Sequence, residues 1–136
     1  MARFLEFIAN HFWLAGAFSA LIIAFITVEI LRGGRNLSPQ AMTLLMNNRE
    51  AVVVDVRDPA EFRQGHITGS RNIPYSRLLE QSAELPKDKP VVIVCNLGQV
   101  AGTAARQLKA KGLTEVYKLE GGISNWKSLS LPLVKR

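Results

Sequence analysis

A long uncharged segment near the N-terminus constrains this chain more than any other feature. Residues 7–28 read FIANHFWLAGAFSALIIAFITV and contain no Asp, Glu, Lys or Arg. A helix that crosses the hydrocarbon core of a bilayer needs about 20 mostly apolar residues. The apolar run from Phe12 to Val28, which resumes after Glu29 with Ile30 and Leu31, has this length. We therefore expect one membrane-spanning helix at this end of the chain.

A cleaved signal peptide and a buried core helix are the alternatives to an anchor. A signal peptide begins with a positively charged region and ends in a cleavage site made of small residues. Here the charges of Arg3 and Glu6 cancel, and the apolar run continues into VEILRGGR, which offers no such site. The sequence therefore favours an uncleaved anchor.

The charged residues that flank this segment predict its orientation. Arg32 and Arg35 follow the span, whereas only Arg3 precedes it. Positive charge gathers on the cytoplasmic side of a membrane, so we expect a single-pass protein with its C-terminal domain in the cytoplasm.

The formal net charge of +6 bears on the partners of the chain. It suits a domain held near the anionic lipid of an inner membrane. The basic residues are scattered, without interleaved aromatic residues or a nucleic-acid motif. We therefore expect no nucleic-acid partner.

The chain divides into two predicted parts. Residues 1–36 are expected to form the anchor and a short flexible linker, Arg-Gly-Gly-Arg-Asn at 32–36, because paired glycines favour flexibility. Residues 37–136 are expected to form one domain. Its first helix begins at Ser38-Pro39, where Ser38 can cap the helix and Pro39 suits the first helical position.

Apolar runs and helix signals alternate along this domain. Strands are predicted at 51–56, 91–94 and 116–119, and helices after Pro39, after Asp58, at 76–81, at 102–111 and near Trp126. Asp58 is expected to cap its helix. This order predicts an α/β fold with a parallel sheet and helices on both faces. Ligands of such sheets bind beyond the carboxyl ends of the strands.

The single cysteine of the chain, Cys95, follows the predicted strand 91–94 at such an end. A turn from Asn96 to Val100 leads from it into a helix, and Gly98 allows a tight curl. Backbone N–H groups of such a turn can surround a sulfur and stabilise an anion on it. The alternative is a small buried hydrophobic side chain. One cysteine cannot form an internal disulfide, and together with two distant histidines it predicts no metal site.

Three separate motifs resemble those of the rhodanese-like sulfurtransferase family. The first motif comprises DVRDPAEF (55–62), GHITGS (65–70) and NIP (72–74), the second is VCNLG (94–98), and the third comprises LEGGI (119–123) with Trp126 and LPL (131–133). The match runs from Leu37 to Leu133 in the right order and leaves out the uncharged segment. The whole chain is similar to a single-domain, membrane-anchored member of this family.

The resemblance implies a rhodanese-like fold and a persulfide mechanism. Cys95 would accept a sulfane sulfur from a small donor, a persulfide or thiosulfate, and pass it to a thiol or protein acceptor. The implied substrate-binding residues are Asn96, Leu97, Gly98, Gln99, Val100, Ala101 and Arg57. Asp55 and His66 would support the site structurally. No cofactor and no metal are implied.

One departure from the family pattern bears on the substrate. Many single-domain members have the loop pattern C..G.RS, whereas Val100 and Ala101 stand at the corresponding positions here. An uncharged loop favours a weakly charged persulfide donor over the thiosulfate dianion. It also leaves open a binding module of low activity that recruits partners to the membrane. A cysteine phosphatase needs an arginine that closes the loop, and the next arginine, Arg106, lies well inside the predicted helix.

Overall fold

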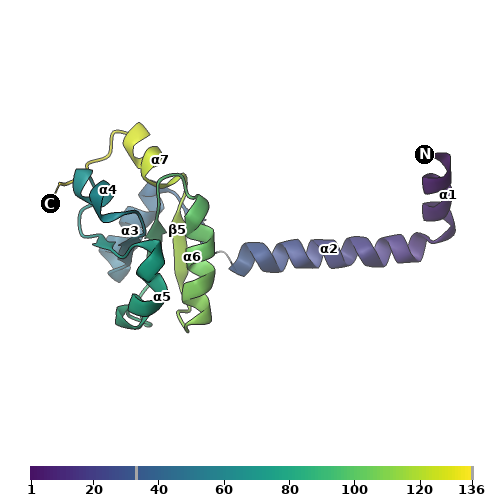
Figure 1. Ribbon diagram of the computed structural model, residues 1–136, viewed down its shortest axis with the longest axis horizontal. Helices are drawn as coiled ribbons and strands as arrows, with labels where there is room; N and C mark the ends of the chain where they lie inside the picture. The colour runs from purple at the N-terminus through teal and green to yellow at the C-terminus, as the bar shows by residue number, and fades with distance from the viewer. Residues whose placement is uncertain (33, 136) are drawn as a thin grey trace. The chain divides into compact units, whose positions relative to one another are not determined.

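The computed structural model describes residues 1–32 and 34–135. They divide into two compact units, Met1–Leu31 and the remainder from Arg32 onward. Figure 1 shows a pair of helices at the N-terminus and an α/β domain at the C-terminus.

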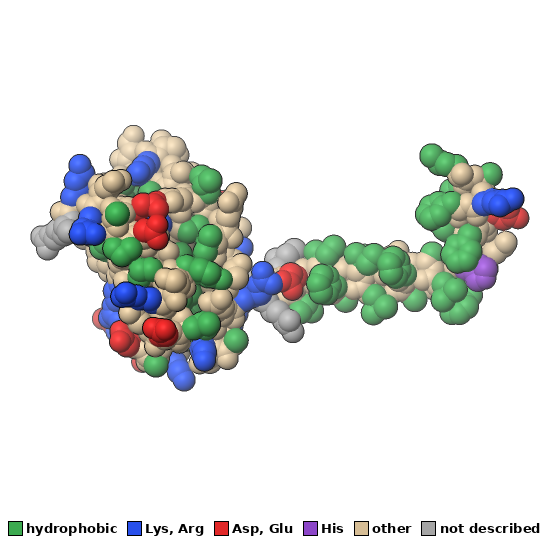
Figure 2. All heavy atoms as spheres, viewed as in Figure 1, with side chains coloured by type: hydrophobic (Ala, Val, Ile, Leu, Met, Phe, Trp, Pro, Cys, Tyr) green, Lys and Arg blue, Asp and Glu red, His purple; other side chains and the backbone are tan. Residues whose placement is uncertain are grey.

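The N-terminal unit consists of two helices, α1 (Ala2–Asn10) and α2 (Phe12–Arg32). The chain turns between the two helices (Figure 1). At His11, between them in the sequence, the backbone N–H donates to the carbonyl oxygen of Phe7 at 3.0 Å. The sequence did not predict a separate α1. Within α2, Phe12–Glu29 is long and apolar enough to cross a membrane, and none of it is buried in protein. The face of α2 seen in Figure 2 is covered by hydrophobic side chains.

The C-terminal unit is built on a five-stranded sheet in the order β1-β5-β4-β2-β3. All four neighbouring pairs are parallel. The strands are β1 (Arg35–Leu37), β2 (Val52–Asp55), β3 (Arg71–Asn72), β4 (Val91–Val94) and β5 (Val116–Leu119). The predicted α/β class and parallel sheet are confirmed.

The helices of this unit alternate with the strands. They are α3 (Pro39–Arg49), α4 (Pro59–Gln64), α5 (Leu78–Gln81), α6 (Gln99–Ala110) and α7 (Gly122–Ser128), with 3₁₀ turns at Tyr75–Arg77 and Ser82–Glu84. Helices α5 and α6 contribute to a hydrophobic cluster on one face of the sheet, and α3 and α7 contribute to a second cluster on the other face.

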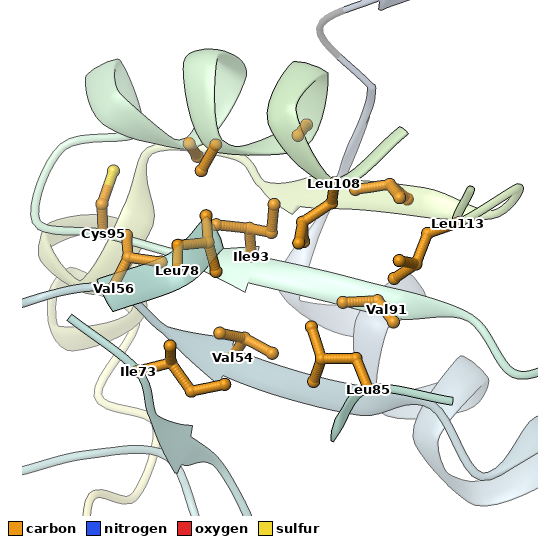
Figure 3. Close-up of a cluster of buried hydrophobic side chains, with 14 residues drawn as sticks. Val54, Val56, Ile73, Leu78, Leu85, Val91, Ile93, Cys95, Leu108 and Leu113 are labelled. Carbon is orange, nitrogen blue, oxygen red and sulfur yellow. The ribbon is translucent and has the colours of Figure 1, made fainter. Parts of the chain in front are cut away.

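Alternation along the strands supplies both clusters. Val91 and Ile93 of β4 belong to the first cluster, shown in Figure 3, whereas Val92 and Val94 belong to the second. Successive side chains of a strand point to opposite faces, so a strand covered on both sides must be apolar throughout. This requirement explains why β4 is a continuous run of Val and Ile.

The expected linker at 32–36 instead contains a strand. Arg35, Asn36 and Leu37 form β1 and pair with β5, and the backbone N–H of Glu120 donates to the carbonyl oxygen of Leu37 at 2.9 Å. The interpretation of these residues as flexible is therefore wrong for Arg35 and Asn36. An edge strand of three residues, two of them exposed, carries no apolar alternation that a sequence reading could detect.

The helix starts agree only in part with the prediction. Ser38 caps α3, since its Oγ accepts a hydrogen bond from the backbone N–H of Ala41 at 3.2 Å. Asp58 occupies the N-cap position of α4, but its side chain makes no capping hydrogen bond, which corrects the prediction. Helix α6 begins at Gln99, earlier than the predicted Gly102, because Gly98 adopts a left-handed conformation with φ of 85° and serves as its N-cap.

Candidate active site

Cys95 directly follows β4, at the carboxyl edge of the sheet. Its side chain is 5% exposed. The backbone N–H of Gly98 donates a hydrogen bond to Cys95 Sγ, with a nitrogen–sulfur distance of 2.9 Å. Because Gly98 is also the N-cap of α6, the sulfur lies at the positive end of a helix of 12 residues. The sulfur thus meets a backbone N–H donor and the partial positive charge of a helix terminus.

A second helix holds the backbone of the cysteine loop. The backbone N–H of Ile123 donates to the carbonyl oxygen of Cys95 at 2.8 Å, and that of Ser124 donates to the carbonyl oxygen of Asn96 at 3.0 Å. Both N–H groups lie in the first turn of α7, where helical partners are missing. The carbonyl oxygens of the loop therefore face α7, and the N–H of Gly98 faces the sulfur.

An open pocket of about 390 Å³ lies over the cysteine. Its lining residues come from the ends of β2 and β4, from α4, from the 3₁₀ turn after β3 and from the start of α6. They are Val56, Arg57, Asp58, Glu61, Tyr75, Cys95, Asn96, Leu97, Gln99 and Val100.

Only some of the loop residues that were predicted to bind substrate line the pocket. Asn96, Leu97, Gln99 and Val100 line the pocket. Gly98 contributes its N–H to the sulfur. Ala101 is fully buried in the hydrophobic cluster beneath α6 and does not line the pocket.

Arg57 lines the pocket, but its guanidinium is engaged within the protein. Nε lies 2.9 Å from Oδ1 of Asp55, and Nη2 lies 2.7 Å from Oδ2. Nη2 also donates to the carbonyl oxygen of Gly65 at 2.8 Å. Asp55 and Arg57 are both buried, so each charge is balanced by the other. The pair joins the end of β2 to the end of α4.

His66 packs inside the domain and is not one of the residues that line the pocket. Its ring stacks on Phe62 with a centroid distance of 3.7 Å and an interplanar angle of 7°. Nδ1 lies 2.8 Å from the carbonyl oxygen of Phe62. The backbone of His66 forms an antiparallel bridge with Val134, which ties the C-terminal segment to the domain.

Asp58, Glu61, Val56 and Tyr75 also line the pocket, and sequence reasoning did not assign them to it. Glu61 Oε2 accepts a hydrogen bond from Asn96 Nδ2 at 2.6 Å. A usable signal was present, because β2 and β4 are neighbouring parallel strands. The residues that follow β2 must therefore lie beside those that follow β4.

Within residues 1–32 and 34–135, no group of three or more His, Cys, Asp or Glu side chains is placed to hold a metal ion.

Comparison of sequences places the chain among known proteins. The family model described as the rhodanese-like domain matches residues 38–129. The uncharacterized protein YibN of Escherichia coli is 32% identical, and the alignment covers 99% of each chain. The uncharacterized protein YqhL of Bacillus subtilis is 46% identical over 57% of this chain and 62% of its own length. The thiosulfate sulfurtransferase GlpE of Pseudomonas aeruginosa is 37% identical over 70% of this chain and 86% of its own length.

The fold has a solved counterpart. The crystal structure of a rhodanese-related protein from Thermoplasma volcanium superposes with a TM-score of 0.69 at 31% identity, and covers 75% of this chain and 99% of that chain. The central parallel sheet and the helices on its two faces are thus those of the rhodanese fold. With a family model that spans most of its length and this solved relative, the chain belongs to the rhodanese-like domain family.

Proposed function

We propose that this protein is a sulfurtransferase in which Cys95 carries the transferred sulfur as a persulfide. The observation that carries the proposal is the hydrogen bond from the Gly98 N–H to Cys95 Sγ at the start of α6, beside an open pocket. The similarity to GlpE, a thiosulfate sulfurtransferase, supports it.

The proposed reaction has two steps. The Cys95 thiolate first attacks the sulfane sulfur of a donor, and the donor's remainder leaves with the electron pair of its broken bond. A thiolate acceptor then attacks the outer sulfur of the persulfide, and Cys95 leaves as the thiolate. The N–H of Gly98 and the positive end of α6 stabilise the anionic sulfur in both resting forms. No cofactor takes part in the proposed cycle.

Intact mass of the full chain, purified in a nonionic detergent, tests the proposal. After treatment with the persulfide of 2-mercaptoethanol or with thiosulfate, we expect the mass to rise by one sulfur atom and to return after addition of a thiol. Because the chain has one cysteine, the added sulfur needs no further localisation. A mass that never changes with either donor contradicts the proposal and favours the alternative, a binding module of low activity.

We further propose that α2 anchors the protein in the inner membrane as a single-pass helix, with the catalytic unit in the cytoplasm. Phe12–Glu29 meets the requirement of length and composition. Helix α1 is amphipathic, which suits a helix that lies at the membrane surface. Its apolar side chains, including Phe4, Phe7 and Ile8, lie on one side, while Arg3 and Glu6 lie on the other.

Protease protection in spheroplasts tests the anchor and its orientation. We expect the full-length chain in the membrane fraction, and a C-terminal tag that resists external protease until the membrane is broken, because the charges after the span are retained inside. A chain shortened at its N-terminus in the mature protein would identify a cleaved signal sequence instead. Digestion of the tag in intact spheroplasts would contradict the proposed orientation.

A further inference from the structure

We propose that Asp58 and Glu61 make the pocket of Cys95 select cationic and neutral sulfur donors and acceptors over anionic ones. The inference rests on the proposed function and adds the substrate class to it. The class that fits best is a small thiol or persulfide that carries an ammonium group.

The pocket carries an excess of negative charge. Among the described residues that line it, Arg57, Asp58 and Glu61 are formally charged. The positive charge of Arg57 is balanced by Asp55, because the two side chains form a buried ion pair with a nitrogen–oxygen distance of 2.7 Å. Two carboxylates therefore remain without a compensating cation on the pocket wall. Arg63 and Arg71, the other arginines near this part of the sequence, do not line the pocket.

Both carboxylates stand beside the cysteine loop at the start of α4. Glu61 is held there by the hydrogen bond to Asn96, the residue that follows Cys95. Asp58 is exposed, and its side chain is not used to cap α4. An anionic molecule that approaches Cys95 thus meets two like charges, whereas an ammonium group meets two opposite ones.

The rest of the pocket wall is uncharged and combines an apolar part with the amide side chains of Asn96 and Gln99. Val56, Tyr75, Leu97 and Val100 supply the apolar part, and Leu97 and Val100 keep 59% and 41% of their surface exposed. The methylene groups of a short aminothiol can contact this wall while its sulfur reaches Cys95 Sγ. Thiosulfate has two negative charges and no apolar part, so it matches neither the wall nor the carboxylates.

The transfer to an aminothiol balances without another reactant. The acceptor thiolate forms a bond to the outer sulfur of the Cys95 persulfide, and the bond between the two persulfide sulfurs breaks. Its electron pair leaves on Cys95, which returns as the thiolate, and the acceptor departs as a persulfide. The ammonium group only positions the acceptor and takes no part in bond making.

Three acceptors of different charge test the inference: cysteamine, 2-mercaptoethanol and 3-mercaptopropionate. Transfer is compared between the full-length wild type and the Asp58→Asn/Glu61→Gln variant, each acceptor against itself, so that intrinsic thiol reactivity cancels. Both substitutions keep the size of the side chain, and Gln at 61 can still accept the hydrogen bond from Asn96. We expect the variant to be about three- to tenfold faster with 3-mercaptopropionate and slower with cysteamine by a similar factor. The rate with 2-mercaptoethanol should change less than about twofold, and all differences should shrink in about 1 M salt.

Glu84→Gln is the matched control, because Glu84 is exposed and does not line the pocket. It should leave all three rates unchanged. Equal changes for the three acceptors in the double variant, or no change, would overturn the inference.

Alkylation separates this inference from the proposed function. The rates of Cys95 with iodoacetamide and iodoacetate are read by intact mass and require no sulfur transfer. In the double variant the rate with the anionic iodoacetate should rise selectively. If it does while no chain takes up sulfur, the charge selection stands and the sulfurtransferase proposal fails. If the ratio of the two rates is the same in both proteins, the charge selection is wrong.

Discussion

Cys95→Ser is expected to reduce sulfur transfer to the background rate while the domain stays folded. A serine hydroxyl is not ionised near neutral pH, and its oxygen cannot carry a sulfane sulfur as a persulfide. The substitution changes little in the packing, because the two side chains are nearly the same size. The Gly98 N–H, which lies 2.9 Å from Sγ, retains an acceptor in the serine oxygen. We therefore expect a loss of stability of no more than about 1–2 kcal/mol.

The measurement combines transfer kinetics with intact mass and thermal unfolding of the full chain. Cys95→Ala is the companion variant, since it also lacks the nucleophile but leaves the Gly98 N–H without its acceptor. The two variants should be equally inactive and should differ only in stability, with Ala the less stable. Retention of sulfur transfer by Cys95→Ser would show that the reaction does not pass through this cysteine.

The sheet was predictable because its central strands are buried on both faces. Val91–Val94 is apolar at every position, which is what a covered parallel strand requires, and β5 likewise coincides with its predicted range. The missed strands are short and lie at the edges of the sheet. β1 has two exposed polar residues, and β3 consists only of Arg71 and Asn72. Their strand character comes from pairing with β5 and β2, and the local sequence does not encode it.

The sequence predicts those features of the candidate site that depend on neighbours in the chain, and it does not predict the direction of side chains. The turn after β4 had to bring N–H groups to Cys95, because a strand end leads there directly into a helix. The direction of the Arg57 side chain is set by hydrogen bonds to Asp55 and Gly65. The sequence alone does not show whether Arg57 binds these two residues or a substrate. Ala101 was assigned to the pocket although the start of α6 at Gln99 turns it into the core.

The two carboxylates of the pocket could be placed only from the order of the strands in the sheet. Asp58 was interpreted as a helix cap and Glu61 only as part of the DVRDPAEF segment, whereas the register that places Asp55 beside Val94 brings both next to the cysteine loop. Residues that follow neighbouring parallel strands lie side by side at the carboxyl edge of a sheet, so the strand order predicts that Asp58 and Glu61 lie near Cys95.

Gly122→Ala is expected to disrupt the cysteine loop and to destabilise the domain severely. Gly122 is buried and has a left-handed φ of 60°. A Cβ added there would overlap the carbonyl oxygen of Cys95 and the carbonyl group of Asn96, which are backbone atoms and cannot rotate away. The same two carbonyls accept the hydrogen bonds from Ile123 and Ser124. Separation of α7 from the loop would therefore break both bonds and move the N–H of Gly98 relative to the sulfur.

Gly69→Ala is the matched control for this variant. Gly69 has a left-handed φ of 83°, but a Cβ added there would meet nothing within 4 Å. Gly69→Ala should lower the free energy of unfolding by about 1–2 kcal/mol through backbone strain alone and leave sulfur transfer intact. Gly122→Ala should cost more than about 3 kcal/mol and abolish persulfide formation, because strain, steric overlap and lost hydrogen bonds add. Urea unfolding followed by the fluorescence of buried Trp126, in a Trp13→Phe background, measures the difference. Equal stability and equal transfer rates in the two variants would show that contact with α7 does not position the cysteine loop.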